Sequence, residues 1–154
     1  MQFEYIIEGG NFSKAGTASS LFKKVLKQLN VDPKLIKRTV VALYEAEVNI
    51  VAHAYNGVIR IDIDTERIYI NLTDNGPGIP DIELAMQKGY STATPEVHEM
   101  GFGAGMGLVN ISRCVDVMKL ESVWGKGTRL RLKIFLKQNE IVGEGFPANK
   151  ENDK

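Results

Sequence analysis

The sequence predicts an α+β fold: a two-layer α/β sandwich in which helices pack on one face of a mixed, mostly antiparallel sheet. Strand-like segments occur at both ends of the chain, and helical segments lie between them. Apolar residues alternate with polar ones in the strand-like segments and recur every three or four residues in the helical segments. The chain has 154 residues, of which 44% are hydrophobic, so we expect one domain with its own core. Its predicted bounds are 1–137, followed by a polar tail over 138–154 that we expect to be disordered.

Three elements are predicted in the N-terminal third. Residues 2–8 mix aromatic and β-branched types, which is typical of a strand. Apolar residues at helical spacing then predict a helix from about 13 to 29. Asp32 followed by Pro33 is typical of a helix start, with an N-cap residue and a proline at the first helical position. This second helix is expected to run over 33–55.

Glycine and proline divide the rest of the chain. The segment 75–105 is rich in both, which predicts a long loop with one short helix over 81–87. Regular apolar patterns bounded by turn residues predict the remaining elements. These are strands at 58–64 and 67–74, a helix at 106–117, and strands at 118–124 and 128–136.

Composition excludes several classes of protein. Nineteen basic and nineteen acidic residues cancel, which gives no reason to expect a nucleic-acid partner. The one cysteine, Cys114, excludes an intramolecular disulfide framework and a thiolate zinc cluster. No signal-peptide pattern opens the chain, and no stretch approaches the roughly 18 apolar residues that cross a bilayer. We therefore expect a cytoplasmic protein without membrane contact.

One side of the predicted helix 33–55 is polar. Glu45, Asn49 and His53 are four residues apart, so they stack along one side of a helix. Small alanines around them leave room for a ligand, although a polar face with ordinary i, i+4 pairing would look the same. Glu47 falls nearly opposite Glu45 and is expected to be solvated. The predicted core stripe consists of Val41, Tyr44, Val48, Val51 and Tyr55.

Two glycine-rich segments could hold a ligand. Asp74 ends a predicted strand and opens DNGPG, where the glycines would let a flat ring approach the backbone; a plain surface turn is the alternative. Residues 101–108, GFGAGMGL, open a predicted helix and could cradle phosphate with backbone N–H groups; a flexible hinge is the alternative. The segment has neither the GK[ST] ending of a Walker A loop nor the preceding strand of a Rossmann fingerprint.

The order of these segments is specific. A helix with ExxxN precedes a strand ending in DxGxG, a loop, GxGxGL at a helix start and a GxGT hairpin. In this order the chain resembles the histidine-kinase-like (GHKL, Bergerat-fold) ATPases, whose fold is shared by DNA gyrase, heat-shock chaperones and sensor histidine kinases. The resemblance covers residues 33–136. EAEVNIVAHAY is similar to the corresponding helix of anti-sigma-factor serine kinases, and DNGPGIPDIELAMQKGYST is similar to the serine kinases that switch stress-signalling complexes.

The resemblance implies that 1–137 is an ATP-binding domain and gives each matching residue a role. Asn49 would coordinate the Mg²⁺ that bridges the phosphates, and Glu45 would be the general base for an attacking serine hydroxyl. Asp74 would bind the amine of adenine, and the segment 89–101 would be a lid. The other implied contacts are Gly76 and Gly78 in the base pocket, Gly103, Gly105, Gly107 and Leu108 at the phosphates, and Thr128 near adenine. Which glycines of 101–107 touch phosphate stays open.

By the same resemblance, we expect a protein-serine kinase that uses ATP and Mg²⁺. Its substrate would be a small antagonist (anti-anti-sigma-like) domain, and it would also bind a sigma factor or another signalling partner. The alternative is a module that binds nucleotide and sequesters a partner without catalysis. The catalytic domain of a sensor histidine kinase and a gyrase-like ATPase are minor alternatives. The first strand and first helix are the surfaces expected for a homodimer.

Overall fold

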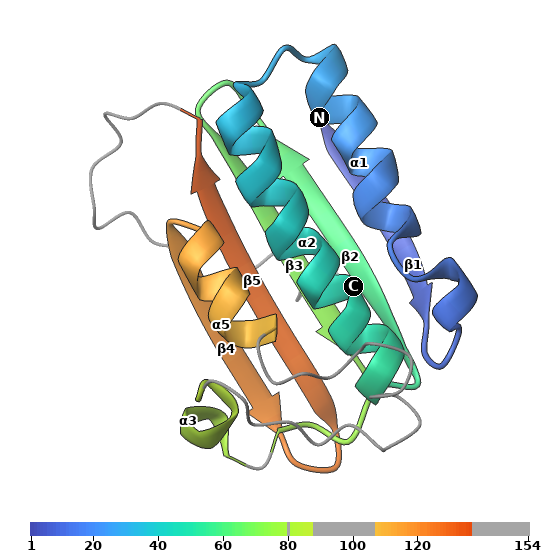
Figure 1. Ribbon diagram of the computed structural model, residues 1–154. Coiled ribbons are helices and arrows are strands. Elements are labelled where there is room, and N and C mark those ends of the chain that lie inside the picture. The colour runs from blue at the N-terminus through green and yellow to red at the C-terminus, as the bar shows by residue number, and fades with distance from the viewer. Residues whose placement is uncertain (80, 88–106, 137–154) are drawn as a thin grey trace.

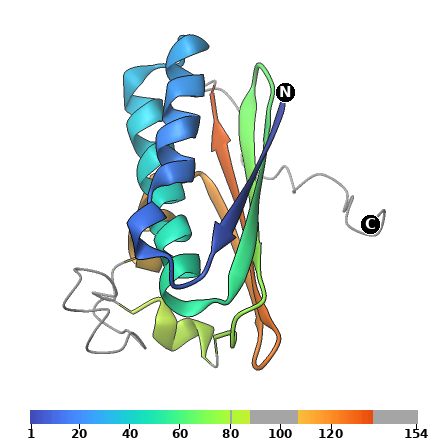
Figure 2. The same ribbon diagram turned by 90° about the vertical axis from the view of Figure 1, so that its right-hand side faces the viewer.

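The computed structural model describes residues 1–79, 81–87 and 107–136. They form two layers, a five-stranded sheet with the helices on one of its faces (Figure 1, Figure 2). The predicted α+β sandwich is therefore confirmed. In chain order the elements are β1 (Gln2–Glu8), the 3-10 turn η1 (Phe12–Lys14), α1 (Thr17–Gln28), α2 (Pro33–His53), β2 (Asn56–Ile63), β3 (Arg67–Asp74), α3 (Ile82–Ala85), α5 (Gly107–Cys114), β4 (Val117–Val123) and β5 (Gly127–Phe135).

The strands are arranged in the order β1-β2-β3-β5-β4. The sequence predicted a mixed, mostly antiparallel sheet, and the four pairings in the described residues are all antiparallel. Because β5 lies beside β3, Asp74 at the end of β3 is paired with Thr128 at the beginning of β5. The sheet register thus joins two segments that the sequence singled out separately.

Alternating side chains fill the space between the sheet and the helices. In a strand every second side chain points to the same face, and β-branched residues fit such a half-buried surface. Phe22 of α1, Leu43 of α2 and Ile111 of α5 close the core from the helix layer. The large hydrophobic residues that β2, β3 and β5 bury are Ile59, Ile61, Ile63, Ile68, Ile70, Leu72, Leu130, Leu132 and Ile134.

The start of α2 agrees with its prediction. Asp32 is the N-cap residue, and its Oδ1 accepts a hydrogen bond of 2.8 Å from the backbone N–H of Lys34. Pro33 occupies the first helical position, where the missing N–H costs nothing. At the other end α2 stops at His53, because Ala54 is already extended with φ −107° and ψ 166°. The two residues predicted beyond His53 therefore lie outside the helix.

The predicted core stripe of α2 was wrong in part. Val48 and Val51 are buried and Val41 is half-buried, but Tyr44 is 40% exposed and Tyr55 is 74% exposed. α2 lies in the middle of the helix layer, between α1 and α5 (Figure 1). Its buried arc is therefore broader than that of a helix that packs only on a sheet. The buried residues of α2 are Ile36, Thr39, Ala42, Leu43, Ala46, Glu47, Val48, Ile50 and Val51.

Glu47 was predicted to be solvated, and this was also wrong. Its side chain is only 1% exposed, and its carboxylate accepts hydrogen bonds from the backbone N–H groups of Gly16, Ala18 and Ser19 at 3.0 to 3.1 Å. These N–H groups open α1, and the N-cap residue Gly16 has no side chain that could bond them. A helix N-terminus has unpaired donors and a partial positive charge, so it stabilises this buried carboxylate.

The start of α1 also differs from its prediction. The sequence predicted a helix from about residue 13, but η1 precedes Gly16, whose φ of 92° lies in the left-handed region. The chain changes direction there, and the α-helix begins at Thr17.

The predicted lid 89–101 and tail 138–154 lie outside the described residues. In the part of the chain that the structure describes, no helix is both long and apolar enough to cross a membrane.

Candidate functional site

Glu45 and Asn49 on α2 face the beginning of α5. A Cβ atom placed on Gly107 would lie 3.3 Å from Asn49 Oδ1 and 3.4 Å from Glu45 Oε2. The bare α-carbon of Gly107 therefore lets the first turn of α5 approach both polar side chains. Both are half-buried. The polar face predicted for α2 and the end of the glycine-rich segment 101–108 thus meet in the folded chain.

Asn110 joins this group, although the sequence reasoning did not single it out. Its Nδ2 donates a hydrogen bond of 3.2 Å to Glu45 Oε1. Its position three residues after Gly107 in a predicted helix places it on the same helix face as Gly107, but nothing in the sequence indicated Glu45 as its partner. The carboxylate of Glu45 is therefore held on one oxygen, while the other lies near Gly107.

Asp74 forms a second group at the end of β3. Its Oδ1 accepts hydrogen bonds from the backbone N–H of Gly76 at 2.9 Å and of Thr128 at 3.2 Å. Partial burial raises the pKa of this carboxyl above its ordinary value, and the two hydrogen bonds and nearby His53 oppose that rise. Both hydrogen bonds use the same oxygen, so Oδ2 has no partner among the described residues and can accept from a ligand.

His53 connects the two groups along α2. It lies one helical turn beyond Asn49, and it interacts electrostatically with Asp74. Burial lowers the pKa of its imidazole, and the Asp74 charge opposes this shift. The polar face predicted for Glu45, Asn49 and His53 therefore extends from the start of α5 to the end of β3.

Gly76 and Gly78 permit close backbone approach after β3. A Cβ atom on Gly76 would lie 2.8 Å from the Cα atom of Ala54 at the end of α2. Gly78 has φ 80°, and a Cβ atom there would collide with the carbonyl oxygen of Val123. A larger residue at either position would push the loop away from α2 or from β4.

The β4–β5 hairpin holds the same loop from the other side. Ser122 Oγ accepts a hydrogen bond of 2.6 Å from the backbone N–H of Ile79 and lies 2.9 Å from Thr128 Oγ1. The N–H of Gly125 donates to the carbonyl oxygen of Pro77 at 2.6 Å. Ser122 was missed by the sequence reasoning, since a serine in a strand carries no signal of its own.

The structure thus brings most of the predicted site residues into two neighbouring groups. Glu45 and Asn49 lie at the start of α5, and Asp74, Gly76 and Thr128 lie where β3, α2 and β5 end or begin. Gly107 begins α5, and Leu108 is half-buried against the core. Gly103 and Gly105 lie outside the described residues. One group offers a carboxylate and an amide beside a helix N-terminus, and the other offers a carboxylate oxygen beside close-packed backbone.

Comparison with known proteins finds a matching family model and similar sequences. Residues 12–134 match the model of the histidine kinase-like ATPase domain family. An anti-sigma F factor of Caldanaerobacter subterraneus subsp. tengcongensis is 31% identical over 144 residues, which are 90% of this chain and 95% of the relative. The serine/threonine-protein kinase RsbT of Bacillus subtilis is 34% identical over 118 residues, or 74% of this chain and 83% of the relative.

A solved structure has the same fold. The mycobacterial sensor histidine kinase MprB superposes with a TM-score of 0.51, covering 88% of this chain and 97% of that one. Its sequence is only 15% identical, so this likeness bears on the fold alone.

Proposed function

The chain belongs to the histidine-kinase-like ATPase family, and from this membership we propose that it is an ATP-dependent protein-serine kinase of the anti-sigma-factor type. It is an ATP-binding regulator that phosphorylates a small antagonist protein domain and binds a sigma factor or another signalling partner. The names of two relatives, anti-sigma F factor and serine/threonine-protein kinase, support this function. We propose that it acts in the cytoplasm.

One observation supports the kinase reaction above all: Glu45 and Asn49 lie side by side at the first turn of α5. Phosphoryl transfer depends mainly on positioning and on charge neutralisation. Backbone N–H groups at the start of a helix favour phosphate oxygens, and Gly107 would contribute here. We propose that Gly103 and Gly105 extend this phosphate contact, with Leu108 packed behind it.

Asn49 is the proposed ligand of Mg²⁺. This cation prefers oxygen ligands and takes several of them from substrate phosphates and water. The carboxamide oxygen of Asn49 lies beside the bare α-carbon of Gly107, so an oxygen donor of the kind that Mg²⁺ prefers is present at the start of α5. When bound, Mg²⁺ supplies charge neutralisation at the phosphates.

Glu45 is the proposed general base. Its Oε1 accepts from Asn110, which orients the carboxylate, and its Oε2 lies on the Gly107 side. Oε2 would take the proton from the serine hydroxyl of the substrate as the hydroxyl oxygen attacks the terminal phosphorus of ATP, the bond from that phosphorus to the bridging oxygen breaks, and ADP leaves. A correctly placed base contributes about 10²–10⁴-fold to the rate.

Asp74 is the proposed adenine contact. Its Oδ2 would accept a hydrogen bond from the exocyclic amine, while Oδ1 is held by Gly76 and Thr128. Gly76 and Gly78 allow the loop to lie close to α2 and β4, which would leave the base a flat pocket. Thr128 would border this pocket.

Two measurements test the proposal. Calorimetry with ATP or ADP and Mg²⁺ tests nucleotide binding, and labelled ATP with the cognate antagonist domain tests phosphoserine formation. Glu45→Ala should retain nucleotide binding and lose transfer by about 10²–10⁴-fold. Glu121→Ala, a change at an exposed position on β4, is the control and should leave both unchanged.

The same experiment separates catalysis from sequestration. If Glu45→Ala still inhibits the activity of its partner as strongly as the unchanged protein does, the chain is a nucleotide-dependent module that sequesters a partner without phosphorylating it. If the unchanged protein takes up neither ATP nor ADP at millimolar Mg²⁺, both functions are excluded.

A further inference from the structure

Charge is unevenly distributed along this neutral chain. Residues 11–40 contain seven basic side chains and one acidic side chain, Asp32, which gives this segment a net charge of +6. Because the whole chain is neutral, the rest of it has a net charge of −6. The basic segment comprises α1, the turn that follows and the first part of α2. Its basic residues are Lys14, Lys23, Lys24, Lys27, Lys34, Lys37 and Arg38.

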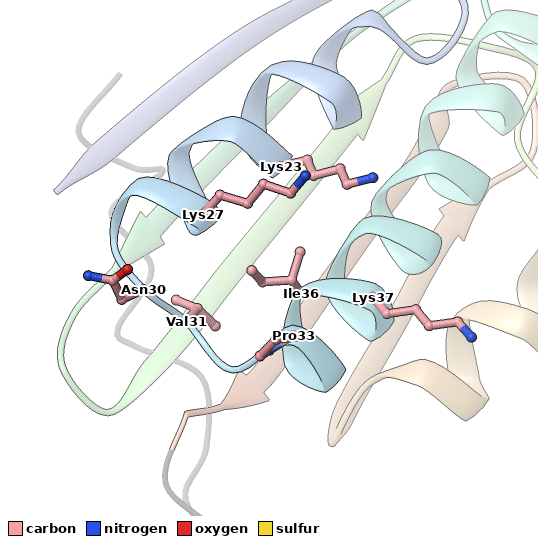
Figure 3. Close-up of a pocket in the computed structure, with 7 residues that line it drawn as sticks. All are labelled: Lys23, Lys27, Asn30, Val31, Pro33, Ile36 and Lys37. Carbon is pink, nitrogen blue, oxygen red and sulfur yellow. The ribbon is translucent and has the colours of Figure 1, made fainter.

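Three of these lysines line a groove between the end of α1 and the beginning of α2. Lys23 and Lys27 come from α1 and Lys37 comes from α2. Figure 3 shows Lys23 and Lys27 extending from α1 toward α2. The groove has a volume of about 590 Å³, and its apolar lining consists of Val31, Pro33 and Ile36. We call it the basic groove.

The lysines of the basic groove lack acidic partners in the described residues. All three are exposed, and no ion pair involves them within 1–79, 81–87 and 107–136. By contrast, Arg38 forms an ion pair of 3.0 Å with Asp116, and Arg60 forms one of 2.8 Å with Glu4. Lys23 and Lys27 are also four residues apart on one helix, where like charges repel. Nothing described in the fold uses these positive charges.

The basic groove is separate from the Glu45 and Asn49 site. Lys37 and Asn49 are both on α2, twelve residues apart, so their α-carbons are about 18 Å apart along the helix axis at 1.5 Å per residue. Asp32 caps this end of α2, so the apolar lining is presented by an ordered turn. A molecule in the groove would leave the nucleotide site open.

We propose that the basic groove binds an acidic amphipathic segment of a partner protein. An apolar side chain of that segment packs on Val31, Pro33 and Ile36, and carboxylates on either side pair with the three lysines. The apolar lining favours a polypeptide over a nucleic acid, whose charged backbone gains nothing from such a surface. Positive and negative surfaces that match also speed the encounter of two proteins. This inference requires neither nucleotide binding nor phosphoryl transfer, so it does not depend on the nucleotide site proposed above.

The test uses the full chain, labelled with ¹⁵N, and a synthetic helical peptide with leucine residues one turn apart flanked by glutamates. A second peptide has glutamine at each glutamate position. The acidic peptide should shift amide signals within residues 23–37 and bind at least about tenfold more tightly than the glutamine peptide. Raising the salt from about 0.05 to 0.3 M should weaken this binding, because exposed charges are screened.

Two double variants locate the contact. Lys23→Glu with Lys27→Glu should weaken binding of the acidic peptide by about tenfold or more. Lys14→Glu with Lys24→Glu changes the net charge equally at exposed positions outside the groove, and should alter binding by less than about threefold. Circular dichroism melts of both variants control for folding.

Several outcomes would overturn the proposal. The acidic peptide at millimolar concentration could cause no shift of the amide signals, or the two peptides could bind equally tightly. The two double variants could also lose equal affinity for the acidic peptide. Tighter binding of a single-stranded oligonucleotide of the same charge would make the groove a nucleic-acid site. Sedimentation that shows self-association lost in Lys23→Glu with Lys27→Glu would make a second copy of the chain the occupant.

Discussion

Glu47 Oε2 accepts a hydrogen bond of 3.0 Å from the backbone N–H of Gly16, so a side chain of α2 caps the helix α1. The same carboxylate also bonds Ala18 and Ser19. Because Gly16 has no side chain, α1 has no N-cap hydrogen bond from its own segment. The packing of α1 on α2 and the capping of α1 therefore depend on one buried residue, which is two positions after the proposed base Glu45.

Glu47→Ala should destabilise the protein by about 2–4 kcal/mol, since it removes a charged acceptor and leaves buried N–H groups unpaired. Glu47→Gln keeps one acceptor oxygen and the side-chain shape, so we expect an intermediate loss of about 1–2 kcal/mol. Urea denaturation measures both. Exposed Glu8→Ala is the control, with an expected change below about 0.5 kcal/mol. A Glu47→Ala protein as stable as the control would show that the cap contributes nothing.

Gly107→Ala should impair the site more than the fold. Its Cβ atom would lie 3.3–3.4 Å from Asn49 and Glu45, so these side chains must move by a few tenths of an ångström. Alanine is favourable in a helix, and stability should change by less than about 1 kcal/mol. We expect phosphoryl transfer to fall by about tenfold or more, because small displacements at a reacting centre are costly. Ser112→Ala, on an exposed position of α5, should leave transfer unchanged.

Asp74→Asn should weaken nucleotide binding and make it insensitive to acid. Only the ionised carboxylate offers Oδ2 purely as an acceptor, and burial raises the pKa of Asp74 above its ordinary value. Affinity for ADP should therefore fall as the pH drops through this raised pKa, at a higher pH than for an exposed aspartate. Asp74→Asn should bind ADP about tenfold or more weakly at neutral pH. Calorimetry across the acid range checks this, with exposed Asp62→Asn as the control.

The same substitution should change the pH dependence of stability. A raised pKa means that the folded protein holds this proton more tightly than the unfolded chain does. Ionisation of Asp74 therefore costs stability as the pH rises from its ordinary pKa to the raised one. Asp74→Asn removes this loss, so its stability relative to the unchanged protein should increase as the pH rises through that window. Parallel pH curves for the two proteins would contradict the assignment.

Gly78→Ala and Gly125→Ala form a matched pair. Both glycines have φ in the left-handed region, at 80° and 84°. A Cβ atom on Gly125 would meet no atom within 4 Å, whereas one on Gly78 would collide with the carbonyl oxygen of Val123. Gly125→Ala should cost about 1 kcal/mol for its backbone conformation alone, and Gly78→Ala should cost about 1–3 kcal/mol more. Thermal denaturation measures the difference, and equal losses would show that the loop moves freely away from β4.

Much of the fold could be predicted from local patterns. The alternating apolar residues of β2, β3 and β5 and the Asp32–Pro33 start of α2 depend on neighbouring residues, so the sequence reveals them directly. Element ends were less accurate: α1 begins at Thr17 because Gly16 adopts a left-handed conformation, which no apolar pattern announces. Tyr44 and Tyr55 were placed in the core because a helical wheel cannot say where neighbouring elements end.

Some residues of the candidate site could be predicted from the sequence, and others could not. The types and spacing of Glu45, Asn49 and Asp74 could be found in the sequence, together with the family that they indicate. Asn110 and Ser122 could not, because an asparagine in a helix and a serine in a strand become informative only beside their partners. Glu45, which accepts from Asn110, and Ile79, which donates to Ser122, are each more than 40 residues away from that partner in the chain.

The sequence by itself determined the secondary structure, the two-layer class and the family, because short-range periodicity and short motifs carry that information. Only the tertiary structure decided that Glu47 is buried, that Gly107 meets Asn49, and that Thr128 bonds Asp74. Each of these depends on the contact of segments far apart in the chain. Burial and hydrogen bonding are properties of such contacts, so a residue's own neighbours in sequence do not contain them.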